Sequence, residues 1–392
     1  MTELLIAPEK EKITAEGCTK TAYDMAMGTS QMLGCLTERL QDVSKDATLT
    51  CFGQEFNPET YAIAKADMLI KGGNASGMKY GDTLSDDAFG GYEFDYVISN
   101  PPFGIDWKRE KPQVEAEAKR GYDGRFGPGL PAISDGQMLF MLNGVKKLKE
   151  GSGRMAIIQN GSSLFTGDAG SGASEIRRYL IHEDLVEAIV QLPTDLFYNT
   201  GISTYIWVLT KGKPMHRSGW VQLIDASKCF VKRRKNIGSK RVDLSDACID
   251  LILQAYEGFE NQTYTNGDLV VESKVFAKDF FGFTKVTVET AQADENGKPI
   301  LKRGKKQPVK GASDSEIIPL NENIDAYMAK NVLPYNPLAY IDPAKDKIGY
   351  EIPFTRLFYK FEAPEPSASI FEDIKALEAK ETVLMKELFG NA

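Results

Sequence analysis

Histidine is scarce in this sequence, which has only His182 and His216 among its 392 residues. Catalytic zinc sites and Ser-His-Asp triads depend on imidazole groups, so we expect neither kind of site and no bound metal. His182 closes a helical pattern, where a cation interacts favourably with the helix dipole, so it needs no catalytic role.

Closely spaced cysteine pairs are also missing. The five cysteines are scattered and no two are separated by just two residues, so the usual zinc spacing is absent. A chain of this length can bury enough apolar surface to fold without disulfides. We therefore expect free thiols in a reducing cytoplasm.

Long apolar runs and a net positive charge are absent as well. No stretch of about 18 apolar residues occurs, and the first residues lack a basic segment followed by an apolar one. We therefore expect neither a membrane span nor an export signal. The formal net charge of −8 argues against broad DNA binding, because neutralising phosphates requires Lys and Arg. Any contact with nucleic acid must rest on local basic patches or on a partner.

Short apolar runs and amphipathic stretches alternate over the first 225 residues. This alternation predicts βαβ units and an α/β fold with a mostly parallel sheet. The expected strands are 21–24, 49–54, 79–81, 95–99, 154–159, 186–191, 204–210 and 220–224. Expected helices include 28–42, 58–72, 135–148 and 172–182.

The remaining segments suggest three parts: a domain at 1–225, an extension with basic loops at 226–365, and a helix at 366–392. The helix alternates apolar and charged positions and is suited to docking on a partner, although packing on its own domain is the alternative. The basic runs at 228–235, 240–241 and 302–306 are either solvated faces or phosphate contacts.

Two polar stretches have no clear periodicity. The stretch at 106–134 follows the expected active-site motif, and it is either a lid or substrate loop or a disordered insertion. The stretch at 290–315 is rich in Gly, Asp and Lys, which indicates an exposed hairpin or linker.

The buried strand pattern at 95–99 ends in Asn100-Pro101-Pro102-Phe103. The prolines stop the strand and stiffen the backbone, and ligands bind at the carboxyl ends of strands in open α/β sheets. The Asn100 side-chain oxygen and the Pro101 carbonyl can accept both hydrogens of an exocyclic amine, which frees the nitrogen lone pair for methylation. Phe103 offers a flat face to a base turned out of a duplex. A lone Asn-Pro-Pro is only a turn signal, but its place after a buried strand is more specific.

Three expected strand ends upstream carry acidic residues. Asp24 precedes a loop at 25–30, where Gly28 permits close backbone approach and the next helix offers N–H groups to a carboxylate. Glu55 stands where an acid holds a ribose diol in dinucleotide folds, and Asp82 can accept from an adenine amine. Ordinary capping is the alternative for Glu55 and Asp82. Three consecutive strands that each end in an acid favour the binding role.

These motifs, in this order, resemble the modification (methyltransferase) subunit of type I restriction–modification systems. The resemblance continues at 153–158, 176–181, 192–204 and 348–356, and it covers nearly the whole chain. It implies a Rossmann-like class I fold dependent on S-adenosylmethionine, with a mostly parallel seven-stranded sheet and helices on both faces. It also implies adenine-N6 methylation of a flipped-out base in DNA, with 1–225 as the catalytic domain.

The resemblance assigns roles to individual residues. The implied cofactor-binding residues are Asp24, Met25, Gly28, Thr29, Ser30, Glu55, Asp82 and Thr83. The implied catalytic residues are Asn100, Pro101, Pro102 and Phe103. The implied partners are DNA, a specificity subunit, a restriction subunit and a second copy of the modification subunit, with no membrane.

Two departures from the family pattern affect these expectations. The family's first loop usually has a proline after the aspartate and two further glycines, where this chain has Met25, Ser30 and Gln31. A helical N-terminal domain usually precedes the first strand, whereas only residues 1–20 precede Thr21 here. We therefore expect an N-terminally truncated subunit whose isolated activity is reduced or lost.

Two other functions remain open on this sequence. One is an Asn-Pro-Pro-Phe methyltransferase that acts on RNA or on a protein glutamine, and the other is a catalytically degenerate scaffold. The family-like segment at 348–356 and the terminal helix favour the DNA system over the first, while the altered loop at 25–31 gives the scaffold some weight.

Overall fold

The structure is a computed structural model, and it describes residues 1–361 and 363–390. The chain divides into two units, Met1–Pro353 and Phe354–Ala392, which are described separately. Within the described residues, no helix combines the length and apolar character needed to cross a bilayer.

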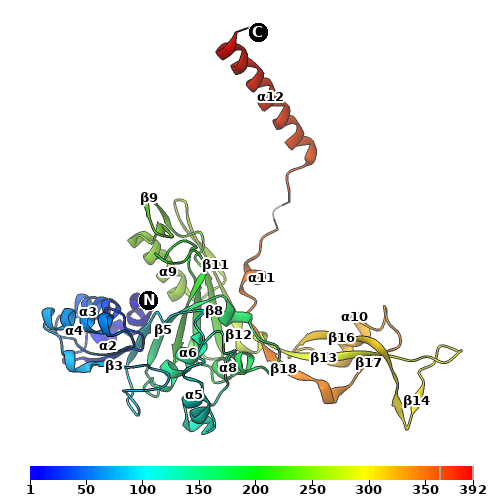
Figure 1. Ribbon diagram of the computed structural model, residues 1–392, viewed down its shortest axis with the longest axis horizontal. Helices are drawn as coiled ribbons and strands as arrows, with labels where there is room; N and C mark the ends of the chain where they lie inside the picture. Colours follow the sequence, from blue (N-terminus) through cyan, green and yellow to red (C-terminus); the bar gives the residue numbers. More distant parts are fainter. Residues whose placement is uncertain (362, 391–392) are drawn as a thin grey trace. The chain divides into compact units, whose positions relative to one another are not determined.

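Ten strands of the first unit form one sheet in the order β11-β12-β8-β6-β7-β5-β4-β1-β2-β3 (Figure 1). They are β1 (Thr19–Asp24), β2 (Thr48–Glu55), β3 (Met78–Tyr80), β4 (Tyr96–Ser99), β5 (Arg154–Asn160), β6 (Val186–Gln191), β7 (Thr204–Thr210), β8 (Trp220–Asp225), β11 (Gln262–Asn266) and β12 (Leu269–Ala277). The first five strands pair in parallel, and β7 lies antiparallel between β5 and β6. This arrangement confirms the predicted α/β class.

The sheet is larger than the seven strands that we expected. Strands β3-β2-β1-β4-β5-β7-β6 form a seven-stranded core, and β8, β12 and β11 continue it on the side of β6. The hydrogen bonds between β12 and β8 carry the sheet past residue 225, where we had placed the end of the first domain. The alternating pattern of β12 contains polar residues, so its membership of the sheet was not evident from apolar runs.

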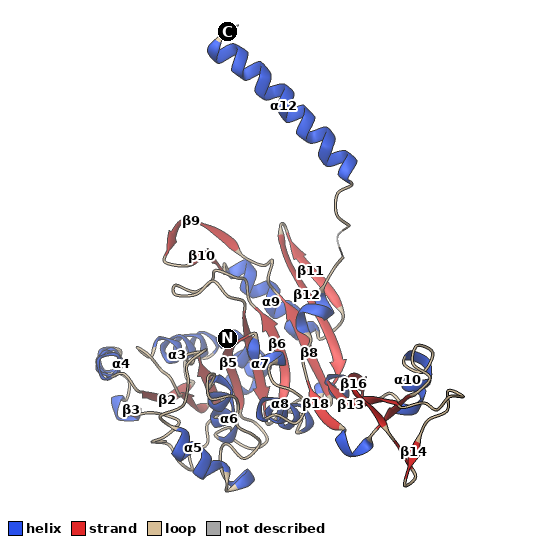
Figure 2. Cartoon of the chain, turned by 45° about the vertical axis from the view of Figure 1, so that its right-hand side comes forward, coloured by secondary structure: helices blue, strands red, loops and turns tan. Residues whose placement is uncertain are grey.

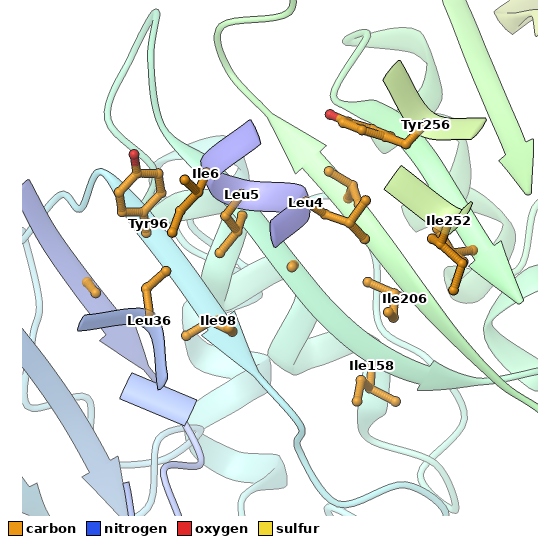
Figure 3. Packing of buried hydrophobic residues seen from close by; sticks show 14 of the residues in the cluster. Leu4, Leu5, Ile6, Leu36, Tyr96, Ile98, Ile158, Ile206, Ile252 and Tyr256 are labelled. Atoms are coloured by element: carbon orange, nitrogen blue, oxygen red, sulfur yellow. The ribbon is translucent and has the colours of Figure 1, made fainter. Parts of the chain in front are cut away.

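Helices cover both faces of the sheet. On one face, Leu4, Leu5 and Ile6 of α1 (Thr2–Ile6) pack with sheet residues such as Ile98 and Ile158 (Figure 3). Residues of α3 (Gln31–Val43), α4 (Pro58–Ile70) and α9 (Asp246–Gly258) join this cluster. Side chains alternate along a strand, so the buried neighbours of Ile98 and Ile158 face the opposite layer. There α6 (Gln137–Lys146) approaches Met155, and α8 (Gly172–His182) contacts α6.

The segment at 106–134 is ordered, which rules out the alternative of a disordered insertion. It contains α5 (Lys111–Ala118) and buries Trp107, Val114, Arg125 and Phe126. The backbone of Trp107 donates to Ile133, and its indole N–H donates to Ala132, so the two ends of the segment are tied together. The buried residues are widely spaced among polar ones, which hid the structure from a periodicity argument.

The rest of the first unit consists of strand pairs and short helices. Strand β13 (Gly282–Ala291) pairs with β16 (Pro308–Pro319), β17 (Ala339–Ile341) and β18 (Lys347–Tyr350), and α10 (Ile324–Asn331) adds Met328 to their small core. The basic runs form two hairpins, β9–β10 (Val231–Ile237, Lys240–Asp243) and β14–β15 (Leu301–Lys302, Lys305–Lys306) (Figure 2). The remaining helices are α2 (Lys10–Ile13) and α7 (Ser162–Phe165).

The second unit contains α11 (Phe354–Phe358) and α12 (Ser367–Phe389). The long helix was predicted from its periodic apolar positions, and its presence is confirmed. Its described side chains are exposed, including Ile370, Phe371, Ile374, Leu377, Leu384 and Leu388. The division of roles among 1–225, 226–365 and 366–392 stays a prediction.

Candidate active site

A pocket lies at the carboxyl ends of β2, β3, β4 and β5, where parallel strands of an α/β sheet place ligands. Its volume is about 910 Å³. Its lining includes eight of the predicted site residues, namely Met25, Glu55, Asp82, Thr83, Asn100, Pro101, Pro102 and Phe103. The other four, Asp24, Gly28, Thr29 and Ser30, do not line it.

The tetrapeptide after β4 places an open acceptor at this pocket. The Asn100 side-chain oxygen is buried and has no hydrogen-bond partner among the described residues. An unsatisfied buried acceptor costs about 1–3 kcal/mol, so a position like this favours a donor from a ligand. Pro101 is buried, Pro102 is exposed, and Phe103 is half-buried against the main core cluster. The tetrapeptide can therefore accept a hydrogen bond and present an aromatic face from one rigid corner.

Asp24 is the last residue of β1, directly before the pocket-lining Met25, and the residue is only 1% exposed. One carboxylate oxygen accepts from the Ser99 hydroxyl at 2.7 Å and from the Ala26 N–H at 3.1 Å. The other oxygen is buried without a partner. Burial raises the pKa of Asp24 to about 7, although the bonds from Ser99 and Ala26 work in the opposite direction. Asp24 is thus poised to ionise when a cation approaches.

Glu55 holds together the backbone around the pocket. One of its oxygens accepts from the Gly28 N–H at 2.9 Å, and the other accepts from the Asn57 N–H at 2.8 Å. The cap of α4 is Asn57, whose side chain accepts from Glu59 and Thr60. Glu55 is therefore not the helix cap, and its carboxylate lines the pocket while it anchors the Gly28 loop.

The loop after β1 has an unusual backbone at Ser30. Its φ of 63° lies in the left-handed region that favours glycine, and its buried hydroxyl has no hydrogen-bond partner among the described residues. Serine stands at a position where the resemblance led us to expect glycine, so this loop carries local backbone strain.

The loop after β3 is held by a buried arginine that the sequence did not single out. Arg125 donates to the carbonyls of Thr83 and Leu84 at 2.7 and 3.2 Å. It also pairs with Glu117 at 2.6 Å. Burial alone would raise the pKa of Glu117, but the Arg125 guanidinium holds it below its usual value. The ordered segment at 106–134 thus braces the strand end that carries Asp82.

Asp82 has two roles in this geometry. One oxygen accepts from the Leu84 N–H at 2.8 Å, which matches the capping alternative, and the residue also lines the pocket. Glu110 lines the pocket too, and its pKa is raised by burial and by the neighbouring carboxylate of Asp82. Together these carboxyl groups make one wall of the pocket acidic.

Several lining residues were missed by sequence reasoning. They come from the ordered segment, from the ends of α6 and β5, and from the loop between β6 and β7, and they include Trp107, Arg109, Glu110, Phe140, Asn160, Phe197, Asn199, Thr200 and Ile202. Asn160 follows the rule that polar residues gather at strand ends, so it could have been found by extending β5. The others carry no local signal, because only the tertiary fold brings them to the pocket.

A polar cluster supports the wall beside Asn160. The Gln137 amide donates to Asn160 at 2.8 Å, to Asp135 at 2.7 Å and to Ser162 at 2.6 Å. Gln137 also accepts from the Asn160 backbone N–H at 3.0 Å. This network fixes the end of β5 next to the tetrapeptide.

Comparisons with known proteins agree with this geometry. The chain is 27% identical over 242 residues to the type I restriction enzyme MjaIX methylase subunit of Methanocaldococcus jannaschii. This match covers 61% of this chain and 41% of that protein. It is 27% identical over 287 residues to the HindI methylase subunit of Haemophilus influenzae, covering 72% and 61% of the two chains. The chain thus spans about half the length of the curated relatives it matches.

A solved structure is also similar. The type I restriction-modification system methyltransferase subunit from Streptococcus thermophilus has 28% identity and a TM-score of 0.58, with 72% of this chain and 54% of that chain covered. Residues 11–296 match the family model described as N-6 DNA Methylase. Since this match takes in the whole pocket and most of the chain, the protein belongs to the N-6 DNA Methylase family.

Proposed function

We propose that the chain is the modification subunit of a type I restriction–modification system and methylates the N6 amine of adenine in DNA. The observation that carries this proposal is the buried, unpartnered side-chain oxygen of Asn100 at the pocket. The family assignment and the printed names of the relatives support it. S-adenosylmethionine is the proposed methyl donor.

The residues around the pocket have the chemistry that this donor requires. A free carboxylate oxygen on Asp24 can accept from an ammonium group, and it is buried without a partner in the described part of the chain. Glu55 offers carboxylate oxygens to a ribose diol, and Asp82 offers one to an adenine amine. When bound, the donor supplies an activated methyl group on a sulfonium. In this proposal Met25 and Thr83 form the adjoining walls, and Gly28, Thr29 and Ser30 shape the loop from behind.

Asn100 and Pro101 act on the target amine. Their two oxygens accept the amine hydrogens and turn the nitrogen lone pair away from ring conjugation. Pro102 holds the Pro101 carbonyl in place, because its ring restricts the preceding backbone. Phe103 stacks on the flipped base, a contact worth about 1–3 kcal/mol. The amine nitrogen would take the methyl carbon as the donor's sulfur–carbon bond breaks and leaves a neutral thioether, and one amine hydrogen would leave as a proton to water.

We propose DNA, a specificity subunit, a restriction subunit and a second modification subunit as partners. A net charge of −8 leaves this chain with little general affinity for DNA, so a partner that reads the sequence is needed. The exposed apolar side chains along α12 suit packing against another helix.

The test is methyl incorporation from labelled S-adenosylmethionine with the matching specificity subunit present. We expect label in N6-methyladenine of unmethylated duplex DNA, and calorimetry should detect binding of the donor. Label found in RNA or in a protein glutamine, and not in DNA, would show that DNA is not the substrate. If millimolar donor does not bind, the chain is a scaffold and the proposal fails.

A further inference from the structure

The β9–β10 hairpin carries one of the dense groups of cations in the chain. Residues 226–243 contain seven Lys or Arg residues and a single acid, Asp243, in a protein whose net charge is −8. Figure 2 shows the two strands standing clear of the main sheet. This hairpin is therefore a local positive surface on an acidic molecule.

The turn of this hairpin is fastened to the loop that lines the pocket. The Ser239 N–H donates to the Tyr198 carbonyl at 2.9 Å, and the Arg241 N–H donates to the Asp195 carbonyl at 2.8 Å. Gly238, with a φ of 59°, lies so close that a β-carbon there would be 2.4 Å from the Tyr198 carbonyl oxygen. The ammonium of Lys240 also lies 5.1 Å from the centre of the Tyr198 ring.

The fastened loop contributes directly to the pocket. Phe197, Asn199 and Thr200, which flank Tyr198, line the pocket together with Asn100 and Phe103. A group bound to the hairpin is therefore connected to the pocket wall through a few backbone hydrogen bonds. Tyr198 itself is 61% exposed, so the surface between the hairpin and the pocket includes an accessible aromatic ring.

Four of the six cations on these two strands are free to bind an external anion. Asp243 pairs with Arg233 and with Lys240, the latter at 3.0 Å, and these pairs stiffen the hairpin. Lys232, Arg234, Lys235 and Arg241 are exposed and make no ion pair within the described residues. Their charges are thus not neutralised by the protein.

We propose that the β9–β10 hairpin binds the phosphate backbone of the DNA beside the target base and guides that base to the pocket. The proposal rests on the proposed function, because it assigns the DNA surface of the same site. Four unpaired cations on an extended ribbon match a row of phosphates, each of which attracts Lys or Arg without regard to sequence. An acidic surface of a partner protein would also attract them, but the connection to the pocket wall favours the molecule that delivers the base.

The experiment compares two variants of the full chain that lose the same charge. The first carries Lys232→Gln, Arg234→Gln, Lys235→Gln and Arg241→Gln, which leaves the two pairs to Asp243 intact. The control loses the same charge at the exposed β14–β15 hairpin, which lines no part of the pocket. It carries Lys302→Gln, Arg303→Gln, Lys305→Gln and Lys306→Gln. Fluorescence anisotropy measures binding to a short labelled DNA duplex over a series of salt concentrations.

We expect the first variant to bind the duplex roughly 100-fold more weakly than the natural chain at about 100 mM salt. The slope of log Kd against log salt should fall by about 3–4, because up to four phosphate contacts are lost. The control should change the affinity less than about threefold, since it removes charge away from the contact. Calorimetric binding of S-adenosylmethionine should be the same for all three proteins.

Four results would overturn the hairpin proposal. They are equal losses in both variants, unchanged DNA binding in the first variant, no duplex binding by the natural chain at low salt, and loss of specificity-subunit binding with DNA affinity retained. The last result would assign the hairpin to a protein partner. A different result would contradict only the proposed function. In that case the chain binds duplex DNA through the hairpin but transfers no methyl group to DNA, and the hairpin proposal is still supported.

Discussion

The strand ends of β1–β3 and the strand end of β4 face one pocket but handle their polar groups differently. Both oxygens of Glu55 and one oxygen each of Asp82 and Asp24 accept backbone N–H groups of the loops after β1, β2 and β3. Asn100 keeps its buried oxygen unpartnered. The second oxygen of Asp24 is likewise buried without a partner among the described residues. The comparison teaches that polar groups at neighbouring strand ends can divide into oxygens that hold the loops and oxygens that stay available to a ligand.

The largest expected effect comes from removing the unpartnered side-chain oxygen of Asn100. Asn100→Ala should reduce methyl transfer by about 100-fold to 1,000-fold, because it removes a preorganised group at the reacting amine. Donor binding, measured by calorimetry, should stay within about twofold, since the donor is assigned to the other strand ends. Asn74→Ala, at an exposed cap of a short helix, is the control and should leave both quantities unchanged. Equal loss of methyl transfer and donor binding after Asn100→Ala would show that Asn100 acts on the donor and not on the target amine.

The bracing of the β3 end should be next in size. Arg125→Ala leaves Glu117 and two loop carbonyls without their buried partner, which should lower the free energy of unfolding by about 3–5 kcal/mol. Arg120→Ala is a matched control, because Arg120 also pairs with Glu117 but its side chain is 62% exposed. It should cost less than about 1 kcal/mol. Urea denaturation measures both, and similar losses would show that the segment at 106–134 does not brace the site.

A pH effect should come from Asp24. Its pKa is raised to about 7 in the folded chain, so between about pH 4 and pH 7 the folded state holds a proton that the unfolded chain releases. The free energy of unfolding should therefore fall as pH rises through this window, by at most about 1.4 kcal/mol per pH unit, and then level off. The variant Asp24→Asn should lack this slope in urea denaturation.

Donor binding should show the opposite trend. An ammonium group needs the ionised form of Asp24, so calorimetric affinity for S-adenosylmethionine should rise up to about tenfold per pH unit below pH 7 and flatten above it. The Asp24→Asn profile should be flat over the same range. Parallel profiles for the two proteins would remove Asp24 from the binding site.

The smallest expected effect concerns the strained loop after β1. Ser30→Gly should raise the free energy of unfolding by about 1 kcal/mol, because glycine tolerates the φ of 63° and has no hydroxyl to bury. Ser30→Ala removes the hydroxyl but keeps the backbone strain, so it separates the two causes. Thermal unfolding measures both variants, and a loss of stability in Ser30→Gly would mean that the loop is not strained.

Much of the α/β scaffold could be predicted from local pattern. The strands β6 and β7 and the helix α8 begin and end at the predicted residues, because strands covered by helices on both faces read as apolar runs between polar breaks. The Asn-Pro-Pro-Phe tetrapeptide at 100–103 also correctly predicted the end of β4. The segment at 106–134 could not be predicted in this way, since Trp107, Val114 and Phe126 are buried without a regular spacing.

The sequence by itself determined the class of fold and the acids and amide at the ends of β1–β4, because hydrophobic alternation and proline act over a few residues. Only the tertiary structure decided which of these groups stay unpartnered, that Arg125 holds the loop after β3, and that the β9–β10 hairpin is fastened to the loop between β6 and β7. The physical reason is that hydrogen-bond satisfaction and charge pairing depend on long-range contacts, whereas strand and helix patterns depend on near neighbours.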